Sequence, residues 1–169
     1  MAKRSSFERR PQDAYQTIDP RAVKALAPHL RYYNYRTFAE PCAGDGHLVR
    51  ELEKQVGLRC VLKSDIEVDA LTIDSWNGAD VIITNPPWNR KTLHRMILHF
   101  QKVRPAWLLF DSDWAYNKHA APYLDQCMDI VAVGRLKWIE GTSHSGKDNT
   151  SWYRFYHRHS GGPRFHGRR

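Results

Sequence analysis

The sequence has 169 residues, of which 41% are hydrophobic and 12% aromatic, so it suits one domain with one packed core and excludes global disorder. Its formal net charge of +8 favours a polyanionic partner such as nucleic acid, with a solvated basic surface as the alternative. Three widely spaced cysteines exclude a disulfide framework and a zinc pattern. No signal peptide or membrane-spanning run is visible, so we expect a soluble intracellular protein.

The chain is expected to begin with a basic flexible arm, residues 1–12, followed by a single domain over residues 13–157. Asp19 can cap a first helix, and Pro20 suits the first helical position. Apolar residues at helical spacing then predict a buried face on this helix. The tyrosine-rich segment 31–36 is expected to be a connecting loop.

A strand, a glycine turn and a helix follow in the most informative local order of the chain. The strand is expected over residues 37–41, the turn over 42–46 and the helix over 47–56, with Gly57 ending it. A second strand over residues 58–64 places Asp65 at its carboxyl end. The next segment, residues 66–78, is too short for a full helix and a full strand, so one standard element is expected to be shortened or lost.

The second half continues the alternation. We expect strands over residues 79–84 and 106–110, helices over 90–103 and 120–127, and a final antiparallel hairpin made of 129–139 and 151–157. The tail, residues 158–169, is rich in glycine, arginine and histidine and is expected to be disordered. The pattern predicts an open α/β sheet, mostly parallel, with an antiparallel C-terminal hairpin.

The segment Thr84-Asn85-Pro86-Pro87-Trp88 follows a buried β-branched run and ends it abruptly, because proline lacks the N–H of a strand ladder. A rigid loop at the carboxyl end of a strand would project the amide of Asn85 and the ring of Trp88 into a crevice. An ordinary proline turn is the alternative.

The glycine turn and Asp65 together indicate a nucleoside cofactor, since glycines allow close backbone approach and a carboxylate can bind both ribose hydroxyls. A dinucleotide is disfavoured because Val49 occupies the place of the third glycine of its fingerprint. Glu40 and Asp45 would also repel a pyrophosphate, whereas they suit the sulfonium and ammonium groups of S-adenosylmethionine.

Residues 40–46, Glu-Pro-Cys-Ala-Gly-Asp-Gly, together with residues 85–88, Asn-Pro-Pro-Trp, resemble the amino-methyltransferase group of the S-adenosylmethionine-dependent methyltransferases. The sequence is most similar to the N6-adenine methyltransferases, particularly small phage-type enzymes, over roughly residues 13–157. The resemblance implies a Rossmann-like class I methyltransferase fold, here shortened between the second and fourth strands.

The resemblance also implies a set of cofactor-binding residues. Gly44 and Gly46 would line the methionine end of S-adenosylmethionine, Asp65 would hold the ribose, and Ile66 and Asp74 would contact the adenine. Tyr15 and Thr17 resemble an element that closes over the methionine end, with a strand-like lead-in as the alternative. The full set is Tyr15, Thr17, Glu40, Pro41, Cys42, Ala43, Gly44, Gly46, Asp65, Ile66, Asp74 and Asn85.

The chemistry of residues 85–88 can be stated on physical grounds. The side-chain oxygen of Asn85 and the carbonyl of Pro86 could accept both hydrogens of an exocyclic amine, and so align its lone pair with a methyl donor. Trp88 would stack on the substrate ring, with core packing as the alternative. The expected catalytic residues are therefore Asn85, Pro86, Pro87 and Trp88.

Two further clusters are candidates for substrate binding. Asp113 and Trp114 follow a strand on the expected ligand side, although capping is the alternative for the carboxylates in this cluster. Lys147 and Asn149 lie in a segment, residues 143–149, that resembles the loop bordering the target base in phage-type relatives; a flexible hairpin tip is the alternative. The nine histidines show no ligand spacing, so no metal is expected.

The expected function is methyl transfer from S-adenosylmethionine to adenine N6 in DNA, in the cytoplasm of a bacterial or phage-infected cell. The target base would flip out, or the substrate would be single-stranded. No insertion is large enough for a target-recognition region, so specificity is low or a partner protein supplies it. The alternatives are an RNA adenine methyltransferase, a protein glutamine methyltransferase, which the basic charge disfavours, and a non-catalytic nucleic-acid-binding relative.

Overall fold

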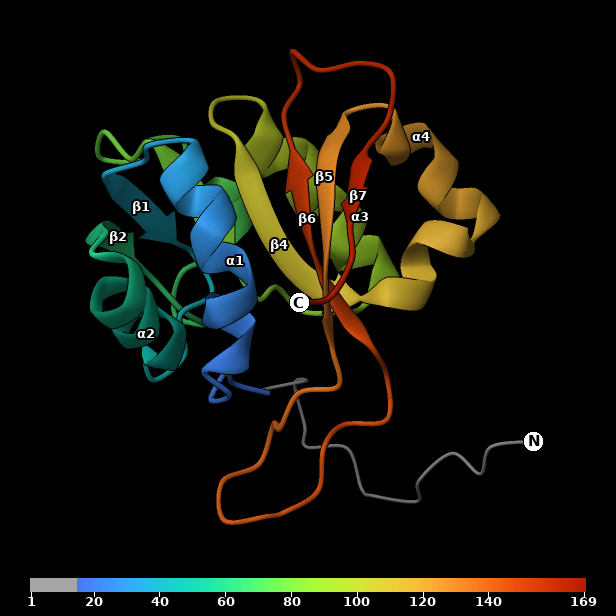
Figure 1. Ribbon diagram of the computed structural model, residues 1–169. Coiled ribbons are helices and arrows are strands. Elements are labelled where there is room, and N and C mark those ends of the chain that lie inside the picture. The colour runs from blue at the N-terminus through green and yellow to red at the C-terminus, as the bar shows by residue number, and fades with distance from the viewer. Residues whose placement is uncertain (1–14) are drawn as a thin grey trace.

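The computed structural model describes residues 15–169, which form a mixed α/β fold around a seven-stranded sheet (Figure 1). The strands lie in the order β2-β1-β3-β4-β6-β5-β7. Their bounds are β1 Thr37–Glu40, β2 Arg59–Lys63, β3 Val81–Thr84, β4 Ala106–Asp111, β5 Cys127–Gly134, β6 Thr150–Phe155 and β7 Arg164–His166. The helices are α1 Arg21–Tyr32, α2 His47–Val56, α3 Arg90–Gln101 and α4 Ala121–Leu124.

The sheet is mostly parallel, as the alternation of strands and helices predicted. Strands β2, β1, β3 and β4 are joined by parallel pairings, whereas β6 pairs antiparallel with both β4 and β5. The predicted antiparallel hairpin near the C-terminus is therefore confirmed. Its two strands are shorter than expected and begin earlier, at Cys127 and Thr150. The fully buried strands β3 and β6 lie inside the sheet, where side chains are covered on both faces.

The predicted shortening between the second and fourth strands is also confirmed. Between β2 and β3 the chain forms one short 3₁₀ helix, η1 Ala70–Thr72, in place of a full helix and strand. Asp69 begins it by accepting a hydrogen bond from the N–H of Leu71 at 2.9 Å. As a result β2 is the edge strand of the sheet.

Helix α2 has the predicted bounds, and α1 begins at Arg21, one residue later than predicted. Before α1, Oδ1 of Asp19 accepts a hydrogen bond from the N–H of Arg21 at 3.1 Å. Helix α2 starts after Gly46 and ends at Gly57, both with positive φ, 80° and 79°. A residue with a side chain rarely adopts this left-handed conformation, so these two glycines define the ends of the helix.

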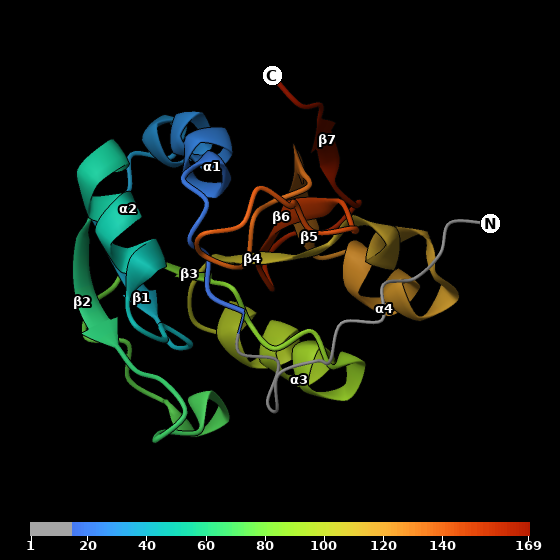
Figure 2. The ribbon, with the colours of Figure 1, turned by 90° about the horizontal axis from the view of Figure 1, so that it is seen from below.

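Two apolar clusters hold the layers together. Helices α1 and α2 cover one face of the sheet, and α3 covers the other (Figure 2). The first cluster includes Leu26 and Leu52 against Trp107 and Trp152, and the second includes Phe100 against Phe110. Burial of this apolar surface, worth about 25 cal/mol per Å², is the main favourable term for the fold.

Three expectations require correction. The helix expected over residues 120–127 is only four residues long, because Cys127 already begins β5. The segment expected to be a loop from residue 31 continues α1 to Tyr32. The tail expected to be disordered contains β7, which pairs in parallel with β5. Its composition gives no local sign of this, because the pairing is with residues 129–131, far away in sequence. The arm at residues 1–12 lies outside the described residues.

Candidate active site

The carboxyl ends of the parallel strands meet at one edge of the sheet, the lower edge in Figure 1. Glu40 ends β1, Asp65 follows β2, Asn85 follows β3 and Asp111 ends β4. In open α/β sheets, ligands bind in the crevice outside these ends. The fold therefore brings the glycine turn, the carboxylate at 65 and the proline loop to the same edge, as the sequence predicted.

The end of β2 is tied directly to the glycine turn. The N–H of Ser64 donates to the carbonyl of Glu40 at 3.1 Å, and the N–H of Ala43 donates to the carbonyl of Ser64 at 2.8 Å. These two bonds extend the pairing of β1 with β2 past the last ladder residues. Asp65, the next residue, is consequently held beside the turn and is partly exposed.

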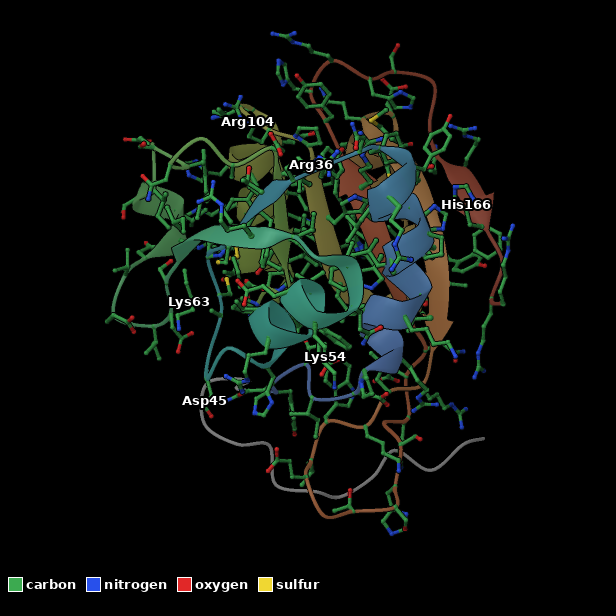
Figure 3. The ribbon with its side chains drawn as sticks, turned by 60° about the vertical axis from the view of Figure 1, so that its left-hand side comes forward. Arg36, Asp45, Lys54, Lys63, Arg104 and His166 are labelled. Carbon is green, nitrogen blue, oxygen red and sulfur yellow. The ribbon has the colours of Figure 1, made fainter. Side chains whose placement is uncertain are left out.

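The glycine turn is covered by the segment that precedes α1. Nε2 of Gln16 donates to Oδ2 of Asp45 at 2.6 Å, and Figure 3 labels Asp45 at this turn. Gly44 has φ +50°, and a Cβ there would lie 3.3 Å from Cδ of Gln16. Glycine is required at position 44 both by the backbone conformation and by the close approach of Gln16.

The same covering segment reaches the proline loop. Nδ2 of Asn85 donates to the carbonyl of Tyr15 at 3.0 Å. Nε1 of Trp88 donates both to Oδ1 of Asn85 at 3.1 Å and to the carbonyl of Leu109 at 3.2 Å. The amide of Asn85 is thus oriented from two sides, and Oδ1 still has acceptor capacity because an amide oxygen has two lone pairs.

Glu40 is the most unusual group at this edge. Its side chain is fully buried, and burial raises its pKa to about 8, with the charge of Asp65 as a further contribution. Oε1 accepts the N–H of Cys42 at 2.9 Å. Oε2 has no hydrogen-bond partner of good geometry among the described residues, and neither has Oγ1 of the buried Thr84 beside it. The hydroxyl of Thr17 and Oε1 of Gln16 share this property.

Trp88 is packed from the side by a loop that follows β5. Its ring lies edge to face with that of Trp138, with centroids 5.6 Å apart. The N–H of Gly146 donates to the carbonyl of Leu136 at 2.7 Å, which closes the loop 135–149 on itself. The loop therefore borders the proline loop and holds the ring of Trp88 in place.

The residues after β4 divide into an exposed and a buried group. Oδ1 of Asp111 accepts the N–H of Asp113 at 2.9 Å, so Asp111 has the capping role. Asp113 is exposed at the edge. Trp114 is only 4% exposed, packs in the core against Phe110, and donates its indole N–H to Nε2 of His94 at 3.0 Å. A buried ring cannot stack on a substrate base, so the expected substrate contact of Trp114 is corrected to core packing.

The loop before β6 lies beside Asp113. The N–H of Ser112 donates to the carbonyl of Asn149 at 2.9 Å, which holds the end of the loop next to Asp113. Lys147 and Asn149 are both exposed. Asp113 and Asn149 are thus neighbours at the edge, although they are far apart in sequence.

The residues expected around the cofactor adenine are exposed. Ile66 is 72% exposed, a high value for an isoleucine, directly after Asp65. Asp74 is also exposed and lies between η1 and β3. The exposed side chain of Ile66 offers an apolar surface on which a flat ring can pack. The surroundings of Asp74 give its expected role no specific support.

Two surface cavities lie at opposite ends of the strands, one beside the carboxyl edge of the sheet and the other at the amino ends. One, of about 420 Å³, lies between α2 and β2 and is bordered by Gly46 and Lys63. Another, of about 470 Å³, lies at the amino ends of the strands and is bordered by Tyr35 and Arg104. Asn85 lines neither of these two cavities. Within residues 15–169, no cluster of His, Cys, Asp or Glu could hold a metal ion, and none of the described helices is long and apolar enough to cross a membrane.

Three residues of this edge were not predicted from the sequence. They are Gln16, which covers Gly44, Thr84, whose buried hydroxyl lies by Glu40, and Trp138, which packs on Trp88. Gln16 and Thr84 directly adjoin predicted residues, which is the signal that could have found them. Trp138 gave no such signal, because its contact spans fifty positions of sequence.

No family model and no curated protein matches the sequence. Among solved structures, the chain is similar to a dimethyladenosine transferase from Plasmodium falciparum, with a TM-score of 0.52 and 13% identity over 83% of this chain and 62% of that one. It is also similar to a protein from Listeria monocytogenes assigned as a class I S-adenosylmethionine-dependent methyltransferase, with a TM-score of 0.52 and 9% identity over 86% and 61%. The chain spans about three fifths of the length of these structures. Together with the strand order, these likenesses show that the chain has the Rossmann-like fold of class I methyltransferases.

Proposed function

We propose that this protein is an S-adenosylmethionine-dependent methyltransferase that acts on the N6 amine of adenine in DNA. The observation that carries the proposal is that the segment before α1, residues 15–20, contacts both motifs. Gln16 is hydrogen-bonded to the glycine turn, and the carbonyl of Tyr15 accepts a hydrogen bond from the proline loop. A methyl donor bound at the glycine turn would therefore lie next to an amine that is held at the proline loop. The fold likeness supports the reaction class, and one similar structure carries the name of an adenosine-modifying enzyme.

The residues at the glycine turn fit this cofactor. The amino-acid end of S-adenosylmethionine brings an ammonium and a sulfonium. Four buried polar atoms, on Gln16, Thr17, Glu40 and Thr84, have no hydrogen-bond partner of good geometry among the described residues. A carboxyl with a raised pKa is readily ionised by a neighbouring cation, since an opposite charge favours its charged form. Asp65 would hold the ribose, and the exposed Ile66 would pack on the adenine.

Catalysis in this proposal is positioning of the acceptor amine. When bound, the cofactor supplies an electrophilic methyl group. Oδ1 of Asn85 and the carbonyl of Pro86 accept the two hydrogens of the amine, which favours a pyramidal nitrogen with its lone pair directed at the methyl. The bond from Asn85 to Tyr15 fixes which end of the amide faces the substrate. Stacking of the target base on Trp88 would contribute about 1–3 kcal/mol.

Nucleic acid is the proposed substrate because of the basic charge and the exposed polar groups around the proline loop. Asp113, Lys147 and Asn149 are exposed, and in this proposal they contact the base or its flanking nucleotides. The target amine is paired inside a duplex, so the base is proposed to flip out of the stack. DNA is preferred on the resemblance of residues 40–46 and 85–88 to those of DNA N6-adenine methyltransferases.

Labelled S-adenosylmethionine tests the proposal when supplied with duplex DNA, single-stranded DNA, RNA and protein. Wild type is expected to label DNA on adenine N6, and Asn85→Ala to lose at least about a hundredfold in rate, as for loss of one positioned polar group. Lys54→Ala, which changes an exposed side chain in the last turn of α2, serves as the control and should keep its activity.

The outcomes separate the proposal from its rivals. Label in RNA alone contradicts the DNA assignment in favour of an RNA adenine methyltransferase, and label in protein alone favours a glutamine methyltransferase. Cofactor binding without transfer to any acceptor favours a non-catalytic nucleic-acid-binding relative. Equal rates for wild type and Asn85→Ala would remove the assigned role of the proline loop.

A further inference from the structure

The C-terminal part of the chain carries only positive side-chain charge. After Asp148 the sequence contains no further Asp or Glu, while it contains four arginines beyond residue 157, namely Arg158, Arg164, Arg168 and Arg169. A free tail of this kind would bind polyanions loosely and without a defined path. The structure instead attaches it to the sheet, and this gives the charges fixed places.

The attachment is made by β7 and one buried carboxylate. β7 pairs in parallel with β5, and Nε2 of His166 lies 2.8 Å from Oδ1 of Asp129 on that strand. Asp129 is 2% exposed and also receives the hydroxyl of Tyr33 at 2.9 Å and Nη1 of Arg154 at 3.4 Å. Although burial opposes ionisation, these partners keep the pKa of Asp129 below its ordinary value, so it stays charged. Figure 3 shows His166 on β7, beside α1.

The segment after β7 runs toward the candidate active site. Because β7 is parallel to β5, residues 167–169 continue toward the carboxyl end of β5, which is Gly134. Nη1 of Arg168 lies 3.2 Å from where a Cβ of Gly134 would be, so the guanidinium rests on the backbone there. From Gly134 the chain enters the loop 135–149, in which Trp138 packs on Trp88.

Two buried carboxylates beside this path are already paired with arginines inside the fold. Asp129 is paired with Arg154, and Asp19, the other buried carboxylate near this path, is paired with Arg21 at 2.5 Å. Nη2 of Arg21 also donates to the carbonyl of Arg135 at 3.1 Å, which holds the exposed Arg135 close to α1. The arginines along the path are all exposed, namely Arg135, Arg164, Arg168 and Arg169.

We propose that Arg135, Arg164, Arg168 and Arg169 form a phosphate-binding ridge that holds the backbone of a DNA substrate and leads it along β7 to the candidate active site. The ridge rests on the proposed function and assigns DNA-backbone binding to residues outside the proline loop. Guanidinium groups suit phosphate because they donate two parallel hydrogen bonds. Contacts of this kind position a nucleic acid without reading its sequence.

Salt dependence measures such contacts directly. Each phosphate that is neutralised on duplex DNA contributes about 0.9 to the slope of log K against log salt concentration. Arg168→Ala and Arg164→Ala should each reduce the slope by about 1, and the double variant by about 2. Lys54→Ala, an exposed cation on α2 away from the ridge, is the matched control and should leave the slope unchanged (Figure 3).

The experiment uses the full chain and a fluorescein-labelled duplex of about 20 base pairs, with anisotropy titrations between about 50 and 200 mM salt. A second pair of variants tests the docking of β7. His166→Ala, which loses the bond to Asp129, should weaken DNA binding and make the C-terminal segment sensitive to limited proteolysis. His166→Gln keeps an N–H donor toward Asp129, so its DNA binding and its resistance to proteolysis should match those of wild type. Circular dichroism and thermal unfolding check that each variant is folded.

Equal slopes for wild type and the double arginine variant would overturn the ridge, as would binding of polyglutamate as tight as that of DNA at the same charge. These outcomes are separate from those for the proposed function, because binding is measured without methyl transfer. If methyl transfer depends on Asn85 but the double arginine variant has the salt-dependence slope of wild type, only the ridge is refuted. A slope reduced as expected without any transfer refutes the proposed reaction and supports the ridge.

Discussion

The buried carboxyl of Glu40 predicts a specific dependence of stability on pH. Burial and the nearby charge of Asp65 raise its pKa from 4.5 to about 8 in the folded chain, so the unfolded chain loses this proton at a lower pH. The group therefore contributes fully to stability below about pH 4.5. That contribution is lost as the pH rises through about 8.

The variant Glu40→Gln isolates the effect, because glutamine has the shape of the protonated acid and does not ionise. A pKa difference of one unit corresponds to about 1.4 kcal/mol. The free energy of unfolding of wild type should thus fall relative to Glu40→Gln by up to about 5 kcal/mol between pH 4.5 and pH 8. Other titrating groups, such as His29 and His94 with lowered pKa values, are shared by both proteins and cancel in the difference.

Urea unfolding of both proteins at about pH 5, pH 7 and pH 9, without cofactor, gives this difference. The exposed Glu67→Gln is the control and should follow wild type at every pH. Parallel curves for wild type and Glu40→Gln would refute the reasoning, since they would mean that Glu40 ionises in the folded chain as readily as in the unfolded one.

The same group should respond to the proposed cofactor. A bound sulfonium and ammonium would lower the pKa of Glu40, so binding near pH 7 should release about 0.9 of a proton. Titration calorimetry in two buffers with different ionisation enthalpies measures the released proton. Wild type should show it and Glu40→Gln should not; equal apparent enthalpies in both buffers for wild type would contradict this linkage.

Three further predictions concern single contacts. Gly44→Ala should lose about 1–2 kcal/mol of stability and weaken cofactor binding, because φ is +50° and the new methyl would press on Gln16; unfolding and calorimetry measure both. Trp88→Phe keeps an aromatic ring for stacking but loses both indole hydrogen bonds, so kcat should fall roughly tenfold with little change in the KM for DNA. Asp129→Asn leaves the charge of Arg154 buried without a carboxylate, and urea unfolding should show a loss of about 3–5 kcal/mol.

The sequence by itself determined much of the local structure, because its signals are local. Helix α2 lies between Gly46 and Gly57 as predicted, since both positions require positive φ. The strand before Asn85 was evident from its β-branched run and from the prolines that end it. The shortening between β2 and β3 followed from the number of residues alone. The carboxyl ends of parallel strands share one edge, so the sequence also indicated which motifs would be neighbours.

The tertiary structure decided the contacts that join distant positions. Asn85 is oriented by Tyr15, seventy positions earlier, and the tail is docked by the bond of His166 to Asp129. Trp114 looked like a substrate contact because it follows a strand at the ligand edge, yet its ring turns into the core. Periodicity and composition report what a residue does within its own element. Which side of that element meets another one depends on packing across the whole chain, and a single sequence does not display it.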